Sequence, residues 1–239
     1  ISAVRGESSY LADCTALLEQ YGMRVEYRLL NCADFGVPQR RERMILVAYR
    51  EDLLFRWPEQ KFFAEPKAWQ QGHMTVWDAI ADLADDASYS PELSHVPMNH
   101  GRLLVERFKL IPEGGKLDLA TLPDELKRSY RTKEVKNFSH INKRLARFAP
   151  ATTMVPGHNA FPLHPTLPRS LTVREAARIQ TFPDWMRFVG TRQQQCMLVG
   201  NAVPPRLAEL LAQTIQKALN GNLANPGFKA DHYELRSAK

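Results

Sequence analysis

The sequence is poor in cysteine, with Cys14, Cys32 and Cys196 far apart among its 239 residues and no Cys-x-x-Cys pair. This spacing matches no common zinc or redox motif, and we expect no metal site and three free thiols. Cys14 and Cys32 lie in apolar patterns, which predicts that both are buried. The apolar runs are far shorter than the roughly 20 residues that cross a bilayer, so we expect no contact with a membrane.

The sequence also lacks an initial methionine and opens on Ile1 without a signal-peptide pattern. We therefore expect the chain to be part of a longer protein or to be processed. Its composition, 44% hydrophobic and 24% charged residues, is typical of a chain that builds a core. The net charge of +6 is compatible with a polyanionic partner, although many proteins that bind no nucleic acid are equally basic.

Positive charge is concentrated between residues 127 and 147, where Glu134 is the one acidic residue. The basic residues of this strip are Lys127, Arg128, Arg131, Lys133, Lys136, Lys143, Arg144 and Arg147. A solvated helix face and a phosphate-binding surface both explain such a strip, and charge alone does not decide between them.

The first 55 residues follow the pattern of an α/β sheet. A helix capped by Ser8 or Ser9 is expected to end at Gly22 and to turn Leu11, Cys14, Leu17, Leu18 and Tyr21 inward. The alternation over residues 25–29 predicts a strand. The continuous apolar run 44–49 predicts a second strand, buried on both faces.

Residues 56–165 contain ten prolines and predict a smaller, irregular lobe. Thr75 with Asp78 resembles a capping box that opens a short helix, and Thr121 with Asp124 is expected to open another towards Tyr130.

Regular structure is expected to return over residues 166–220. Thr172 and Glu175 form a third capping-box pattern, residues 200–205 read as a turn, and leucines from Leu207 onwards predict an amphipathic helix. Residues 221–239 are expected to be a tail.

Three segments, taken in order, resemble the C-terminal motifs of the DNA (cytosine-5) methyltransferase family. Residues 35–43, Phe-Gly-Val-Pro-Gln-Arg-Arg-Glu-Arg, resemble motif VIII; residues 169–184 resemble motif IX; and residues 200–205, Gly-Asn-Ala-Val-Pro-Pro, resemble motif X. The resemblance implies the C-terminal part of a Rossmann-like, S-adenosylmethionine-dependent methyltransferase sheet. It also implies that the irregular lobe, 56–165, is the target-recognition domain, between the sheet end at 1–55 and the returning segment at 166–220.

Three features of that family are missing from the sequence: the glycine-rich cofactor loop, the Pro-Cys nucleophile and the Glu-Asn-Val acid. The cysteines instead follow Asp13, Asn31 and Gln195. We therefore expect the chain to be inactive alone and the missing half to lie on the same parent chain or on a partner subunit.

The resemblance assigns roles to the motif residues. Arg43 would donate to cytosine O2, Arg41 would line the same pocket and Gln39 would support the loop; the simpler alternative is surface charge before a strand. Motif X would close the S-adenosylmethionine pocket, unless it is a plain turn before a helix. Its residues are Gly200, Asn201, Ala202 and Val203.

Motif IX is expected to be structural, with Glu175 as a cap and Arg169 and Arg174 as buried braces. The candidates for DNA contact are Lys133, Lys136, Arg144, His158 and Asn159. The last two of these are as easily explained as ordinary loop residues.

The implied reaction is transfer of a methyl group from S-adenosylmethionine to C5 of a cytosine flipped out of a specific double-stranded DNA sequence, as in restriction–modification. We expect this setting to be the bacterial cytoplasm or nucleoid. The alternative function is a non-catalytic DNA-binding or regulatory relative of the methyltransferases.

Overall fold

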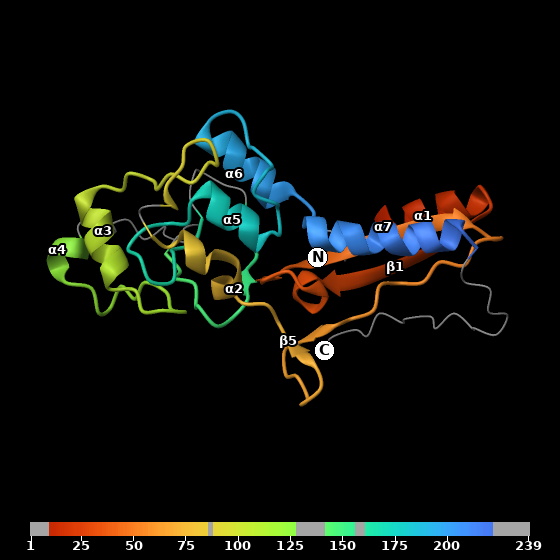
Figure 1. The fold of residues 1–239 in the computed structure, drawn as a ribbon, viewed down its shortest axis with the longest axis horizontal. Helices are drawn as coiled ribbons and strands as arrows, with labels where there is room; N and C mark the ends of the chain where they lie inside the picture. Colours follow the sequence, from red (N-terminus) through yellow and green to blue (C-terminus); the bar gives the residue numbers. More distant parts are fainter. Residues whose placement is uncertain (1–9, 86–87, 128–141, 156–160, 222–239) are drawn as a thin grey trace. The chain divides into compact units, whose positions relative to one another are not determined.

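The computed structural model describes residues 10–85, 88–127, 142–155 and 161–221 (Figure 1). The chain divides into two compact units. Unit 1 consists of residues 1–30, 42–59 and 209–239, and unit 2 consists of residues 31–41 and 60–208. Residues 166–208 thus fall in the same unit as most of the lobe that the sequence analysis set apart.

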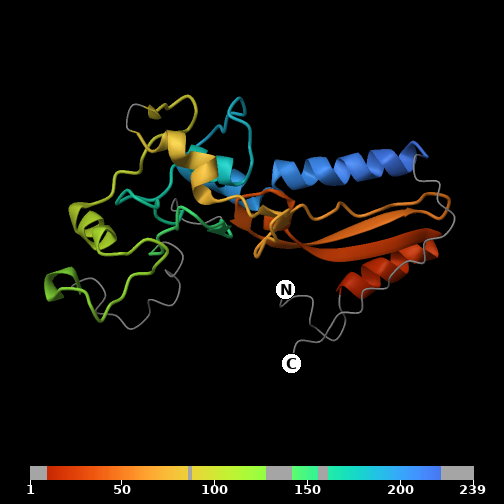
Figure 2. The same ribbon diagram turned by 60° about the horizontal axis from the view of Figure 1, so that its bottom comes forward.

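Unit 1 is built on a two-stranded sheet of β1 (Met23–Asn31) and β3 (Glu42–Arg50). Both strands were expected from the sequence, and each extends beyond the predicted run. Helices α1 (Tyr10–Gln20) and α7 (Pro205–Leu219) lie on opposite sides of this sheet (Figure 2). Gly22 follows α1 with a φ of 70°, which confirms that a glycine ends this helix.

The helix faces of unit 1 are less buried than the sequence predicted. Helix α1 has no buried residue, and Leu17 on its apolar side is 54% exposed. Cys14 is exposed, so the prediction of a buried thiol was wrong there, whereas Cys32 in unit 2 is buried as expected. Most of β3 is only partly buried and Met44 is exposed, so the prediction of a strand covered on both faces was also wrong.

A small aromatic cluster closes one part of unit 1. The Trp57 indole donates to Glu26 at 2.8 Å, and the Tyr49 hydroxyl donates to the same carboxylate. Phe55 packs edge-on against Trp57, with ring centroids 5.2 Å apart. Burial, together with the hydrogen bond to Glu26, raises the pKa of Tyr49 to about 12.

Unit 2 contains mostly short elements. They are η2 (Cys32–Phe35), β2 (Gln39–Arg40), β4 (Phe62–Phe63), β5 (Gln71–Gly72), α2 (Val76–Ile80), η3 (Ala81–Leu83), α3 (Arg102–Lys109), α4 (Asp124–Lys127), β6 (Ala151–Thr152), α5 (Val173–Ile179) and α6 (Arg192–Asn201). Strand β2 pairs in parallel with β6, and β4 pairs in parallel with β5. No helix in the described ranges is long and apolar enough to cross a membrane.

The core of unit 2 forms where α2 and α6 pack against α5. Its fully buried side chains include Ile80, Met154, Phe161, Leu171 and Val199. The capping boxes expected at Thr75 and at Thr172 are both present, with the cap hydroxyl and the third-residue carboxylate each bonded as that motif requires.

Two helices of unit 2 were not expected from the sequence, α3 and α6. Helix α6 opens with a capping box of Thr191 and Gln194 and includes Gly200 and Asn201 as its last two residues. The segment interpreted as one turn is therefore a helix end followed by a short link, Ala202–Pro204, into α7. Helix α4 begins at Asp124, and Thr121, which was expected to cap it, lies three residues earlier and donates its hydroxyl to the Asp118 carbonyl instead, so that cap was predicted wrongly. The predicted continuation of the helix to Tyr130 lies outside the described residues.

Candidate functional site

The loop that leads into the predicted catalytic segment is folded tightly on itself. Gly36 ends η2 with a φ of 83°, and a Cβ on it would lie 2.7 Å from the Phe62 ring, so only glycine fits. The Asn31 side chain accepts from the backbone N–H of Ala33 and of Arg41, each at 3.3 Å. The two ends of the loop, residues 31 and 41, are thereby held together.

A second anchor joins this loop to residues 61–73. The Lys61 backbone N–H donates to the Asp34 carbonyl at 3.2 Å. The Asp34 carboxylate lies 2.9 Å from the His73 ring nitrogen Nε2, and the His73 side chain is almost fully buried. The loop therefore has a fixed shape within unit 2.

Gln39 and Arg41 both point into unit 2 and bind the same backbone segment. The Gln39 side-chain oxygen accepts from the Met154 N–H at 3.1 Å, and Arg41 Nη1 donates to the Met154 carbonyl at 3.2 Å. Gln39 is fully buried and Arg41 is 2% exposed. The Gln39 side chain thus makes one hydrogen bond to this segment, which is the kind of contact that a loop-supporting residue would make.

Arg41 also reaches the predicted cofactor segment. Its Nη2 donates to the Gly200 carbonyl at 2.9 Å and to the Ala202 carbonyl at 3.1 Å. These carbonyls lie at the C-terminal end of α6, where the helix dipole is negative and a guanidinium is favourable. The structure therefore brings Gln39, Arg41, Gly200 and Ala202 together, and one buried arginine connects motif VIII with motif X.

Arg43 has a different environment from Arg41. It belongs to β3 in unit 1, is partly exposed, and donates from Nη1 to the neighbouring Glu42 carbonyl at 2.7 Å. The described residues give its guanidinium no other hydrogen bond or ion pair. Most of its donors are therefore available, as a residue that contacts a substrate requires.

The rest of the predicted cofactor segment is partly open. Asn201 and Val203 are exposed, and the Asn201 amide has no partner among the described residues. The start of α7 offers fewer free N–H groups than expected, because Pro204 and Pro205 have none and the Arg206 N–H donates to Thr181 Oγ1 at 3.1 Å. An anion at this place would depend on Asn201 more than on the helix start.

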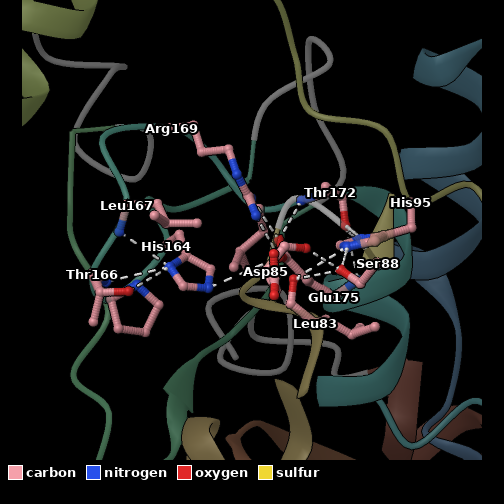
Figure 3. A network of polar contacts seen from close by, with 12 residues as sticks. Leu83, Asp85, Ser88, His95, His164, Thr166, Leu167, Arg169, Thr172 and Glu175 are labelled. Atoms are coloured by element: carbon pink, nitrogen blue, oxygen red, sulfur yellow. Dashed lines mark hydrogen bonds and ion pairs between the residues drawn. The ribbon is translucent and has the colours of Figure 1, made fainter. Parts of the chain in front are cut away.

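A buried polar network surrounds the start of α5 (Figure 3). Arg169 donates two hydrogen bonds to the Glu175 carboxylate, at 2.9 and 2.8 Å, and the Thr172 N–H donates a third at 2.7 Å. Burial raises the pKa of Glu175, but these bonds and the charge of Arg169 outweigh burial and hold the pKa below its usual value. The predicted structural role of Glu175 and Arg169 fits this arrangement.

Two histidines extend the network on either side. His95 Nδ1 lies 2.8 Å from Thr172 Oγ1. His164 Nδ1 accepts from the N–H groups of Thr166 and Leu167, and its other nitrogen, Nε2, lies 3.8 Å from Glu175. Burial lowers the pKa of His164 to about 4, although the Glu175 charge acts in the opposite direction. The network thus holds a neutral imidazole beside an ionised carboxylate.

Arg144 is not available to DNA as the sequence analysis expected. It is 5% exposed, and its guanidinium donates to the carbonyls of Phe108, Ile111, His164 and Leu167 at 2.6 to 2.8 Å. Because these bonds occupy its donors inside the lobe, we withdraw Arg144 from the DNA-contact set. The other candidates, Lys133, Lys136, His158 and Asn159, lie outside the described residues.

Two features of the site could not be predicted from the sequence. The Met154 backbone is the shared partner of Gln39 and Arg41, and Gly200 lies inside a helix. The alternation Gln39–Arg40–Arg41, typical of a strand with alternate residues inward, was the one signal that could have placed Gln39 and Arg41 on the buried side. No group of three or more histidine, cysteine or acidic side chains suited to a metal occurs in the part of the chain that is described.

Comparison with known proteins places this α/β chain in a family. The model of the C-5 cytosine-specific DNA methylases matches residues 5–217, so the chain belongs to that family, whose members use S-adenosylmethionine. The Type II methyltransferase M.AplI of Arthrospira platensis is 32% identical over 219 residues, which cover 91% of this chain and 54% of the relative. M.XorII of Xanthomonas oryzae is 34% identical over 240 residues, covering 86% of this chain and 53% of the relative.

The fold is also similar to a solved structure described as a DNA modification methyltransferase encoded within an E. coli prophage. The TM-score is 0.63 at 20% identity, with 91% of this chain and 67% of that chain covered. The chain spans about half the length of the curated relatives it matches, which include M.BbvI of Brevibacillus brevis at 50% coverage of the relative.

Proposed function

We propose that the chain is the target-recognition and cofactor-closing part of a Type II DNA (cytosine-5) methyltransferase that acts in a bacterial cytoplasm. The reaction would move a methyl group from S-adenosylmethionine to C5 of a flipped cytosine in double-stranded DNA. The main support is the connection of motif VIII to motif X through Arg41, which donates to Met154, Gly200 and Ala202. The match over residues 5–217 supports the same function.

In this proposal Arg43 contacts the base. Attack of a thiolate on cytosine C6 leaves negative charge on O2 and N3, and a planar guanidinium can donate to O2 as that charge develops. The available donors of Arg43 and its place on β3 suit this task, whereas both terminal nitrogens of Arg41 are bound to backbone carbonyls and hold the loop. We therefore keep Arg43 as the candidate catalytic residue, with Gln39 and Arg41 as positioning residues.

S-adenosylmethionine would supply the electrophilic methyl group when bound. On this chain its pocket would be closed by Asn201, whose amide has no partner among the described residues, and by the exposed side chain of Val203. Gly200 and Ala202 would shape this wall through their carbonyl bonds to Arg41, which fix the direction of the link into α7.

The remaining half of the active site would come from another segment. The chain contains no Pro-Cys sequence, and it spans about half of each relative, 54% of M.AplI for example. We propose that the nucleophilic cysteine lies on that other half, in the same parent protein or in a partner subunit.

Transfer of labelled methyl groups to mixed-sequence duplex DNA tests this function, with the chain alone and with its upstream half restored. We expect transfer only with the upstream half, and Arg43→Ala to reduce turnover by about a hundredfold or more at nearly unchanged duplex affinity. Arg50→Ala, at the end of the same strand and paired with Asp52, is the matched control and should retain turnover.

Two results would contradict the proposal. Unchanged turnover in Arg43→Ala would remove this residue from the mechanism. Absence of transfer by the restored protein, with DNA binding retained, would favour the alternative of a DNA-binding or regulatory relative.

A further inference from the structure

Two extended segments of unit 2 each place one arginine inward and a neighbouring cation outward. At the end of β2, the exposed Arg40 is followed by the buried Arg41. In the segment that begins at residue 142, Arg144 is buried next to Lys143, which is partly exposed. Successive residues of an extended chain point to opposite sides, so the buried arginines leave Arg40 and Lys143 facing away from the interior.

A third cation lies directly opposite Lys143. Lys116 and Lys143 form an antiparallel bridge, flanked by hydrogen bonds from the Leu117 N–H to the Asn142 carbonyl and from the Arg144 N–H to the Gly115 carbonyl, both 2.9 Å. Directly opposite residues of an antiparallel pair have their Cβ atoms about 4.5–5.5 Å apart on one face. The backbone therefore holds two lysine side chains together, an arrangement that repulsion disfavours.

The positive charge of Arg40 also acts on the amine of Lys143. Burial lowers the pKa of Lys143, and the charges of Lys116 and Arg40 lower it further. Residues from three separate segments, 39–41, 115–117 and 142–144, thus combine their positive charge around one half-buried ammonium group.

No acidic side chain of the described residues pairs with any of these three cations. Other surface cations of the chain do have such partners: Lys109 pairs with Glu106 at 2.9 Å and Arg147 with Glu113 at 3.1 Å. A cluster of like charges that is held by backbone pairing and has no counter-charge is suited to bind an external anion.

We propose that Arg40, Lys116 and Lys143 form a binding site for the phosphates of the DNA backbone. The inference rests on the proposed function for the identity of the polyanion. A guanidinium can grip a phosphate through two hydrogen bonds, and two ammonium groups add charge without geometric demand. Because Arg40 lies in the motif VIII segment and the lysines lie in the recognition lobe, the site would set the register of duplex DNA without reading its sequence.

The experiment compares the salt dependence of duplex binding by the chain and by a triple variant. Arg40→Gln, Lys116→Gln and Lys143→Gln together should reduce the slope of log K against log salt by roughly 2 to 3, since each phosphate contact contributes about 0.9. The reduction should be the same for duplexes of unrelated sequence, because phosphate contacts carry no sequence information.

The matched control neutralises three cations that already have acidic neighbours: Arg50→Gln, Lys109→Gln and Arg187→Gln. Its net charge equals that of the first variant, so an equal loss of slope in both would show a general charge effect and overturn the site. A circular dichroism spectrum and an unfolding midpoint like those of the unmodified chain establish that the triple variant is folded.

The outcomes separate this inference from the proposed function. If the restored protein transfers methyl groups but the triple variant keeps the original slope, the phosphate site is wrong and the proposed function stands. If the slope falls while the restored protein transfers none, the site stands and the function fails. A third outcome is that the triple variant binds the upstream half more weakly while the salt slope of its DNA binding is unchanged. The three cations would then contact an acidic protein surface, and the inference would be overturned.

Discussion

The two units of this chain differ in what they bury. Unit 2 encloses charged side chains together with hydrogen-bonding partners: Glu175 is fully buried against Arg169, and the buried Arg144 donates to backbone carbonyls. Unit 1 leaves apolar side chains in solvent, and Leu17 and Leu29 are 54% and 55% exposed. Burying a charge is costly unless it is paired, whereas exposing a leucine forgoes burial energy. Unit 2 therefore has an interior that includes paired charges, whereas α1 and β1 of unit 1 leave these two leucines largely unburied.

Breaking the Arg169–Glu175 pair gives the largest expected effect on stability. Glu175→Gln removes the negative charge and leaves Arg169 buried without its counter-ion, so we expect the free energy of unfolding to fall by about 3–5 kcal/mol. Urea denaturation measures the change. Asp52→Asn, which breaks the exposed pair with Arg50 in unit 1, is the control and should cost less than about 1 kcal/mol. Equal losses would refute the contrast between the units.

The same network predicts a loss of stability in mild acid. The pKa of His164 is lowered from 6.5 to about 4 on folding, so between these pH values the unfolded chain binds more protons than the folded one. Stability should therefore fall as the pH falls through this window, by about 3 kcal/mol for His164 alone. The pKa values of His95 and His100 are also lowered by burial and act in the same direction.

His164→Asn isolates this contribution. Its amide oxygen can accept from the Thr166 and Leu167 N–H groups in place of Nδ1, and it does not titrate. Unfolding curves recorded from pH 7 to pH 4 should show a shallower decline in the variant. An identical decline in both proteins would mean that His164 does not titrate on unfolding as proposed.

The sequence predicted local signals better than tertiary ones. The capping boxes at Thr75 and Thr172 are complete in four residues and could be identified. Helix α6 could not, because Arg-Gln-Gln-Gln-Cys-Met-Leu-Val-Gly-Asn has no repeating apolar face, and its glycine suggested a turn.

The arginines show the same limit at the candidate site. Arg41 and Arg144 are held by backbone carbonyls that lie 20 to 161 residues away in sequence, and a carbonyl partner leaves no mark in composition. A basic strip therefore predicted Arg144 as a DNA contact, when its neighbour Lys143 faces outward. The charge pattern marked this segment as basic, and only the paired backbone distinguishes its buried side from its exposed side.

Arg41 in unit 2 and Arg43 in unit 1 allow a local test of the contrast between the two units, with a smaller expected effect on stability. Arg41→Lys keeps the charge, but one ammonium group cannot reach both the Met154 carbonyl and the carbonyls of Gly200 and Ala202. We expect a loss of about 1–3 kcal/mol, the cost of a buried acceptor left without a donor. In the restored protein, affinity for S-adenosylmethionine should also fall. Arg43→Lys, two residues away in unit 1, should change neither quantity appreciably.

The smallest effect on stability is expected for the exposed apolar residues of unit 1. Its size should differ between the chain alone and the protein with its upstream half restored. Leu17→Ala on α1 and Leu29→Thr on β1 remove side chains that are about half exposed, so each should change the stability of this chain by no more than about 0.5 kcal/mol. If the upstream half covers this surface, the same substitutions should cost about 2 kcal/mol or more in the restored protein, as buried leucine truncations do. Leu103→Ala on α3 of unit 2, where the leucine is also partly exposed, should have a small effect in both settings. Small effects of all three in the restored protein would show that unit 1 is not the surface on which the upstream half packs.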